Sequence, residues 1–103
     1  MYEEFTQKRI AQLRLSRDVS ARDMSLSLGQ NVNYINHIEN GKSMPSLQGL
    51  FYICEYFGIT PEEFFDEGNI APVMLREMTD NFKKLDPALQ KQLSELIRLL
   101  SSK

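Results

Sequence analysis

Gly29 separates two short stretches whose apolar residues have helical spacing, and it leaves room for only a very short turn. Before it, Met24 and Leu28 lie four residues apart. After it, Ile35 and Ile38 lie three apart. Such spacing places both members of each pair on one helix face. Glycine adopts a positive φ at little cost and is well suited to end a helix. The sequence therefore predicts two helices that meet at a tight turn.

Residues that begin or end helices recur along the rest of the chain. No segment shows the alternation of apolar and polar residues that is typical of a half-buried strand. Helices are expected over about residues 4–16, 20–29, 30–40, 45–58, 60–68, 72–85 and 86–100. We expect Asn31 to cap the third of them and Asp86 to cap the last. The segment from Gly68 to Pro72 is the best internal boundary. The predicted fold is all-α, with a five-helix domain over residues 1–68 and an antiparallel helical pair over residues 69–103.

Core positions follow from the same spacing. In the fourth helix the expected apolar stripe is Leu47, Leu50, Phe51, Cys54 and Phe57. Further core positions are expected at Met24, Phe64 and Phe65.

Composition excludes several classes of function. The chain has one Cys and one His, so a disulfide, a metal site and a Cys–His catalytic pair are all unsupported. No carboxylate pair, activated nucleophile or phosphate-binding loop stands out, so we expect neither a cofactor nor enzyme activity. The acidic N-terminus predicts no signal peptide, and no apolar run is long enough to span a membrane. The lone Cys54 fits a reducing, cytoplasmic location.

Charge is unevenly distributed along the chain. Twelve basic and fourteen acidic residues give a net charge of −2, which argues against a polycationic coat for nucleic acid but not against DNA binding. Residues 46–68 contain five acidic residues and no basic one. This acidic segment would repel DNA and so help to orient any DNA-binding face.

The last predicted helix has an apolar stripe. Its members are Leu89, Leu93, Leu96, Ile97 and Leu100. The stripe either folds back on the first domain or pairs with a second copy of the chain. Its length favours a homodimer.

The two helices around Gly29 have the spacing of a helix-turn-helix. Residues 9–65 resemble the Cro/phage-repressor (XRE) family of DNA-binding domains. The matching residues are Arg9-Ile10, Leu13-Arg14, Val19-Ser20, Gly29, Tyr34-Ile35, Ile38-Glu39-Asn40-Gly41-Lys42, Pro45-Ser46, Leu50 and Gly58-Ile59-Thr60. Three positions depart from the family pattern: Ala21 replaces a phosphate-binding Gln, Ser25 replaces an Ala, and Asp18 replaces a Gly. Arg22 is a candidate to bind phosphate in place of that Gln.

The resemblance implies roles for particular residues. Base edges would be read by Val32, Asn33 and His37, with Asn36 beside them. Phosphates would be bound by Ser20, Arg22, Asn31, Asn40, Lys42 and Ser43, in part through backbone amides. The alternative is that these residues form only a solvated helix face. Asparagine is a poor helix former, however, so several exposed asparagines on one helix need a reason.

The resemblance also implies an ion pair between Arg14 and Glu39 that joins the first helix to the third. The alternative is an exposed pair of little energetic value.

The function expected from these features is that of a sequence-specific transcriptional regulator. We expect a repressor that binds double-stranded DNA as a homodimer on a partly palindromic operator. The alternative is a protein-interaction module, as in an antitoxin, in which the helix-turn-helix serves as a scaffold and a protein partner binds elsewhere.

Overall fold

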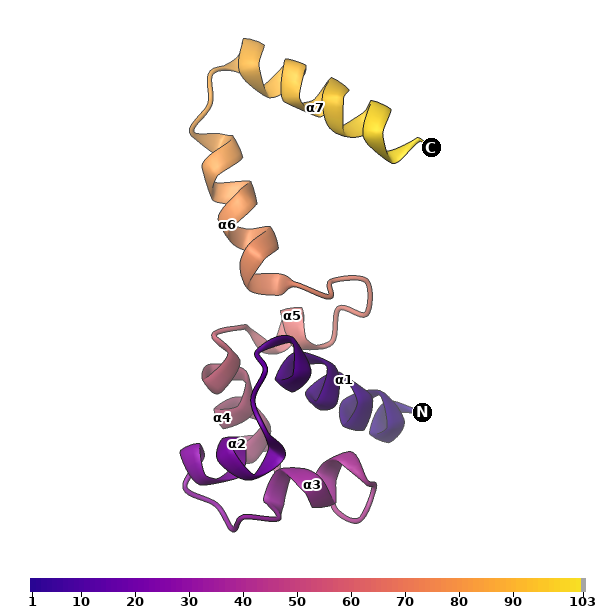
Figure 1. Cartoon of the computed structure of the whole chain (residues 1–103), viewed down its shortest axis with the longest axis vertical. Coiled ribbons are helices and arrows are strands. Elements are labelled where there is room, and N and C mark those ends of the chain that lie inside the picture. Colours follow the sequence, from indigo (N-terminus) through magenta and orange to yellow (C-terminus); the bar gives the residue numbers. More distant parts are fainter. Residues whose placement is uncertain (103) are drawn as a thin grey trace. The chain divides into compact units, whose positions relative to one another are not determined.

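The computed structural model describes residues 1–102, which form helices joined by short turns (Figure 1). The helices are α1 (Tyr2–Ser16), α2 (Ala21–Ser27), α3 (Tyr34–Glu39), α4 (Leu47–Phe57), α5 (Pro61–Phe64), α6 (Pro72–Lys83) and α7 (Pro87–Ser101). No strand occurs within residues 1–102, and the predicted all-α class is confirmed. Residue 103, the last of the predicted second domain, lies outside the described residues.

The chain divides into two compact units, Met1–Ile70 and a second unit that begins at Ala71. The boundary predicted from the sequence lies two residues earlier, after residue 68. The difference has a structural reason, because α1 holds the intervening residues by hydrogen bonds. Arg9 Nη2 donates to the Asn69 carbonyl at 2.7 Å, and Gln12 Nε2 donates to the Ile70 carbonyl at 2.9 Å.

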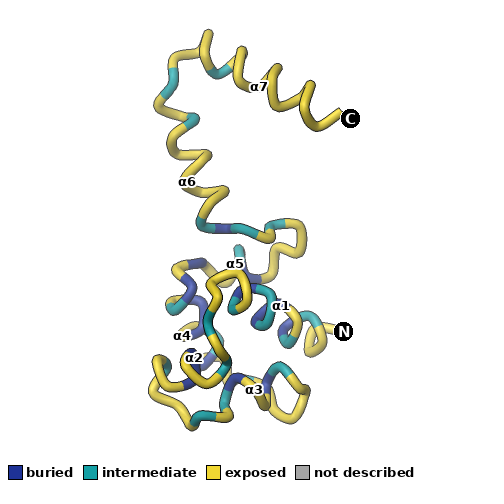
Figure 2. Tube along the Cα trace, in the orientation of Figure 1, coloured by how far each residue is buried: buried dark blue, intermediate teal, exposed yellow. Residues whose placement is uncertain are grey.

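The apolar core lies in the first unit, and each of α1 to α5 contributes to it (Figure 2). Its buried members are Ile10, Leu13, Met24, Ile35, Ile38, Ile53, Cys54, Phe57, Ile59 and Phe64. Burying a large apolar side chain stabilises a fold by about 1.5–3 kcal/mol. This core therefore holds the two helices on either side of Gly29 in place.

The buried face of α4 differs from the predicted stripe. Leu47 and Phe51 are exposed, whereas Ile53 is buried with Cys54 and Phe57. Together with the half-buried Leu50, these three residues follow the i, i+3, i+4, i+7 spacing of one narrow helix face. Positions 47 and 51 fall at the edge of that face. The expectation that Phe65 is a core residue is also wrong, because its side chain is 45% exposed.

The first four helices end in the same hydrogen-bond pattern. After α1, the Asp18 amide donates to the Leu15 carbonyl at 3.0 Å and the Val19 amide donates to the Arg14 carbonyl at 3.4 Å. This is a Schellman motif, which needs a residue with positive φ. Asp18 supplies it with a φ of 55°, and Gly29 supplies it after α2 with a φ of 72°.

The second unit contains α6 and α7, joined by a turn before Pro87. Asp86 caps α7 as predicted, since its side chain accepts a hydrogen bond from the Leu89 amide at 3.0 Å. The predicted antiparallel packing of the pair is not observed, because α7 has no buried residue and diverges from α6 at the turn (Figure 1). Asp86, which precedes Pro87, has the extended conformation expected of a residue before proline, with a ψ of 161°.

Candidate nucleic-acid interface

The turn between α2 and α3 is fixed by a buried serine. Ser25 is fully buried on α2, and its Oγ donates to the Ala21 carbonyl at 2.7 Å. The same oxygen accepts a hydrogen bond from the Ile35 amide at 3.0 Å. That amide lies in the first turn of α3, where backbone donors have no partner within the helix. Ser25 therefore joins α2 to the start of α3, a role that spacing alone did not indicate.

Helix α3 begins later than the sequence predicts. Its N-cap position is Asn33, which makes no capping hydrogen bond through its side chain. The expected cap, Asn31, instead closes a turn ahead of the helix. Its Oδ1 accepts from the Asn33 amide at 2.9 Å, and its carbonyl accepts from the Tyr34 amide at 3.0 Å. The structure thus places Val32 and Asn33 in this turn rather than on α3.

The four candidate base-reading residues come from two adjoining segments. Val32 and Asn33 lie in the turn, and Asn36 and His37 lie on α3. Val32 is half-buried, and the other three are exposed. The side chain of Asn40 donates to Asn36 Oδ1 at 3.1 Å. An asparagine amide can pair with the N6/N7 edge of adenine, so the exposed side chains have the chemistry needed to read bases.

The candidate phosphate contacts have to be revised in the loop after α3. The amides of residues 40–43 all donate to carbonyls within the domain, and those of Lys42 and Ser43 share the His37 carbonyl at 2.8 and 3.3 Å. These amides are therefore not available to a phosphate, contrary to expectation. The side chains of Asn40, Lys42 and Ser43 remain exposed.

Two further phosphate candidates lie at the start of α2. Ser20 is the N-cap, and its Oγ accepts from the Asp23 amide at 3.0 Å. Arg22 is exposed on the first turn of the same helix. Arg22 is thus accessible to bind phosphate in place of the family's glutamine, whose position is occupied by Ala21 in this chain.

Arg14 and Glu39 form the ion pair that the resemblance implies. Arg14 Nε donates to Glu39 Oε2 at 2.8 Å, and Nη2 donates to Oε1 at 2.9 Å. The two side chains are 15% and 12% exposed. The hydrogen bonds that Arg14 donates to Glu39 raise the pKa of Arg14 more than burial lowers it. Since Glu39 is the last residue of α3, the pair attaches the end of α3 to α1.

Two other arginines, Arg9 on α1 and Arg17 directly after it, were not recognised as structural from the sequence. Arg9 is 5% exposed, and it donates to the carbonyls of Glu63 and Phe64 at 2.8 and 2.7 Å. Arg17 donates to the carbonyls of Tyr56 and Phe57. These arginines satisfy carbonyls at the ends of α5 and α4, where the helix dipole favours positive charge. The only signal was their position on, or directly after, a helix that carries core residues.

The packing of α3 on α4 depends on the absence of a side chain at position 49. Gly49 is buried, and a Cβ atom built there would lie 2.7 Å from the Tyr34 hydroxyl. That distance is shorter than any normal contact, so the tyrosine occupies space that only a glycine leaves. Desolvation in this position raises the pKa of Tyr34.

The five residues of the predicted dimer stripe are all exposed on α7. Leu93 is the least exposed, at 38%, and Leu100 the most, at 59%. Leu89, Leu93 and Leu96 also line a shallow groove with Leu85, of about 320 Å³. The stripe is therefore an apolar surface in the second unit.

The short α2, the tight turn and α3 held at both ends define a repressor-type helix-turn-helix domain, a class of DNA-binding module. Residues 10–64 match the family model described as Helix-turn-helix. The chain belongs to this family of DNA-binding regulators, of the XRE type. Comparisons with curated proteins and with solved structures gave no match.

Other classes of site find no support among residues 1–102. None of these residues forms a cluster of three or more His, Cys, Asp or Glu side chains that could hold a metal ion. No helix in this range has both the length and the hydropathy needed to cross a bilayer. The family is one of regulatory DNA-binding domains rather than of enzymes.

Proposed function

We propose that this protein is a transcriptional repressor that binds a partly palindromic operator as a homodimer. The observation that carries the proposal is the exposed polar surface of Asn33, Asn36 and His37 next to a rigidly held α3. The stability of the fold does not require these three exposed polar side chains, nor does it explain why they lie on and next to a helix that is fixed at both ends. Base recognition supplies that need, because it requires side chains held in a defined position.

Sequence would be read by four side chains. Asn33 and Asn36 would hydrogen-bond adenine, and Val32 would contact a thymine methyl group. His37 would donate to guanine or to a phosphate. The proposed operator therefore contains A·T pairs in each half-site.

Orientation on the duplex would come from phosphate contacts, which carry no sequence information themselves. Arg22 and Lys42 supply charge, and Ser20, Asn31, Asn40 and Ser43 supply polar groups. The acidic segment over residues 46–68 would face away from the DNA.

Dimerisation would come from the α7 stripe of Leu89, Leu93, Leu96, Ile97 and Leu100. Two copies would then place their α3 helices in successive major grooves, about 34 Å apart. A dimer bound in this way would block a promoter by occupying it.

Selection of the full chain against a random DNA library at near-physiological salt, with light scattering on the same sample, tests the proposal. The expected result is an enriched palindrome bound by a dimer. Weak, salt-sensitive binding with no enriched sequence would contradict it.

A protein-interaction module, like an antitoxin, is the second candidate. The observation that favours it is the acidic segment of five carboxylates and no basic residue over residues 46–68. Failure to enrich any DNA sequence would favour this function over the first.

A further inference from the structure

The last residues of the first unit are attached to α1 by one network of hydrogen bonds. Arg9 Nη2 donates to the Asn69 carbonyl at 2.7 Å, and Gln12 Nε2 donates to the Ile70 carbonyl at 2.9 Å. Arg9 Nη1 also donates to Gln12 Oε1 at 2.9 Å, which orients the Gln12 amide so that its nitrogen faces Ile70. Residues 69 and 70 are therefore held in place although they belong to no helix.

Burial makes Arg9 the main member of this network. Its side chain is 5% exposed, and it also donates to the carbonyls of Phe64 and Glu63 at 2.7 and 2.8 Å. Burial lowers the pKa of Arg9, and the charge of Asp66 opposes that shift. The guanidinium stays protonated, so these are charge-assisted hydrogen bonds, which are about twice as strong as neutral ones. One buried side chain thus fixes the chain from α5 to Asn69.

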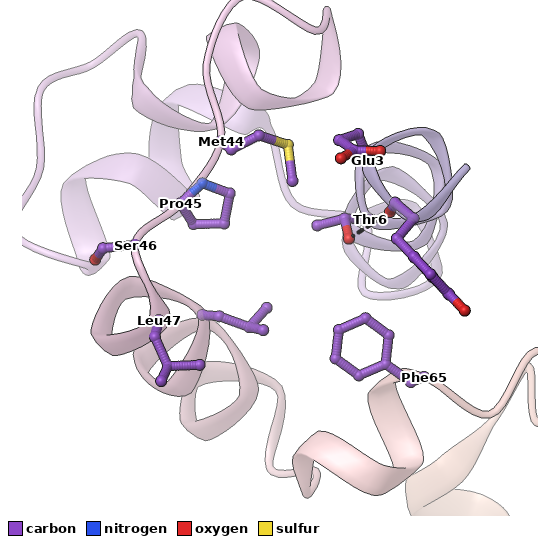
Figure 3. A pocket seen from close by; sticks show the side chains of 9 residues that line it. Glu3, Thr6, Met44, Pro45, Ser46, Leu47 and Phe65 are labelled. Carbon is purple, nitrogen blue, oxygen red and sulfur yellow. Dashed lines mark hydrogen bonds between the residues drawn. The ribbon is translucent and has the colours of Figure 1, made fainter.

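Ring contacts pack the start of the same segment on α1. Phe65 directly follows α5, and its ring stacks on that of Phe5 of α1 at 6.0 Å between centroids. Figure 3 shows Phe65 on one side of a pocket of about 510 Å³ whose other walls include Glu3 and Thr6 of α1. The chain that leaves α5 is therefore held on α1 by apolar as well as polar contacts.

Helix α1 is also the helix to which α3 is attached. The ion pair between Arg14 and Glu39 joins the two helices through hydrogen bonds of 2.8 and 2.9 Å. Gln12 and Arg14 lie two residues apart on α1. Ile70 and α3 are therefore bound to the same part of one helix, so the first unit ends at a fixed position relative to α3.

The connection from this position to the α7 stripe leaves few backbone angles free. Ala71 alone separates Ile70 from α6, which begins at Pro72. The Ala71 carbonyl already accepts a hydrogen bond from an α6 amide at 2.9 Å, and a following proline restricts the backbone of the residue before it. At the other end of α6, Gln90 Nε2 of α7 donates to the Phe82 carbonyl at 3.1 Å.

We propose that Arg9 and Gln12 are positioning residues that determine which spacing of operator half-sites the protein accepts. This role rests on the proposed function, because it requires a homodimer joined through the second unit. Each base pair added between the half-sites moves them apart by about 3.4 Å and rotates one relative to the other. A dimer whose second unit leaves each domain at a fixed position tolerates such a change poorly. A dimer with a flexible connection tolerates it, because the connection can then span several distances.

The same three-residue insertion at two places tests this role. Gly-Ser-Gly is inserted either between Ile70 and Ala71, after the attached residues, or between Glu67 and Gly68, in the exposed turn before them. Three flexible residues span about 10 Å, which exceeds the shift caused by one base pair. The later insertion should therefore allow several spacings. The earlier one should only enlarge the turn, at little cost in free energy.

The measurement uses full chains and palindromic operators whose selected half-sites are separated by spacers of different length. The parent and the chain with the earlier insertion should prefer one spacing about tenfold over spacings one base pair longer or shorter. The later insertion should reduce this preference to about threefold or less. Affinity for a single half-site and the dimer mass in light scattering should be equal in all three chains, which separates this role from a general loss of structure.

Gln12→Glu tests the residue itself. The new carboxylate still accepts from Arg9 Nη1 but cannot donate to the Ile70 carbonyl. In NMR relaxation of the protein without DNA, the backbone order parameter of Ile70 should fall from about 0.85, typical of rigid backbone, to about 0.7 or lower. The spacing preference should weaken in the same variant. Gln7→Glu is the matched control on the same helix, because the Gln7 side chain lies against Gly41.

Two results would overturn this role for Arg9 and Gln12. One is the same spacing profile in the two insertion chains. The other is a parental order parameter together with a parental spacing profile in Gln12→Glu. Failure to enrich any palindrome is a different outcome, since it contradicts the proposed function and the spacing role with it.

Discussion

Two arginines on α1 and one directly after it illustrate how the role of a residue is decided by its surroundings. Arg9, Arg14 and Arg17 add positive charge to the half of the chain that carries the helix-turn-helix. Their guanidinium groups are all used within the domain, on carbonyls or on Glu39. The proposed phosphate binding would therefore rely on exposed residues such as Arg22 and Lys42.

Base-reading and phosphate-binding residues should respond differently to mutation. Asn33→Ala or His37→Ala should relax base preference at a single operator position, at about 1–3 kcal/mol for each base interaction removed. Lys42→Ala should weaken binding to all sequences alike and reduce the dependence of affinity on salt. Titration of the selected operator and of single-base variants at several salt concentrations separates the two effects. If both classes of variant bind like the parent, the assignment of the interface is wrong.

Ser25 offers a test of the buried link between α2 and α3. Ser25→Ala removes the acceptor for the Ile35 amide and leaves a buried donor without a partner. We expect the free energy of unfolding to fall by about 1–3 kcal/mol. Urea unfolding followed by circular dichroism measures it. Ser27→Ala is the control, since Ser27 is exposed on the same helix. Equal losses in the two variants would argue against this role for Ser25.

At the scale of whole elements, the position of α3 depends on the contacts made at its two ends more than on its own length. The helix has six residues, too few to be stable alone. Ser25 holds its start, and Glu39 at its end is bound to Arg14. The position of α3 is therefore set by α1 and α2.

The ion pair between Arg14 and Glu39 can be measured by a double-mutant cycle. Removing either partner leaves a largely buried charge unpaired, so Arg14→Ala or Glu39→Ala should each cost about 3 kcal/mol. The double variant should cost less than the sum of the two. The exposed pair of Arg98 and Glu95 is the control, and its coupling should stay below about 1 kcal/mol. Comparable coupling in both pairs would refute a structural role for Arg14 and Glu39.

The contact of α3 with α4 predicts a dependence of stability on pH. Burial raises the pKa of Tyr34 above its ordinary value of 10.0. Above about pH 10 the unfolded chain therefore loses this proton before the folded domain does, so the free energy of unfolding falls as pH rises. Tyr34→Phe should reduce that fall, and Tyr2→Phe, at an exposed tyrosine, should not. Urea unfolding between pH 8 and pH 10.5 makes the comparison, and identical slopes would contradict it.

Local signals and long-range contacts differed in how well they could be predicted. The helix order, the turn at Gly29 and the cap at Asp86 depend on neighbouring residues, and sequence patterns report these directly. The start of α3 was placed too early because the chain forms a turn at Asn31. The burial of Ile53 agrees with the spacing of Leu50, Cys54 and Phe57, but Leu47 and Phe51 also have helical spacing, so the pattern alone did not decide between two overlapping faces. The carbonyl contacts of Arg9 depend on residues far along the chain, and spacing carries no information about those.

At the scale of the whole molecule, affinity for DNA should depend on having two copies. The net charge is −2, and few exposed cations lie near the proposed interface. Each phosphate neutralised adds to affinity, so a domain with few such contacts binds weakly by itself. Two linked domains convert the second binding event into an intramolecular one and raise the overall affinity.

We therefore predict that disrupting the α7 stripe weakens dimerisation and operator binding together. Leu93→Glu places a charge in the stripe, and light scattering should then report the 12.0 kDa mass of one chain where the parent gives twice that mass. Affinity for a palindromic operator should fall together with dimerisation, while affinity for a single half-site stays the same because α3 is unaltered. Leu99→Glu is the matched control, because Leu99 is also exposed on α7 but lies outside the stripe. A monomeric parent would show that the stripe does not join two copies, and the chain would then have to bind each half-site independently.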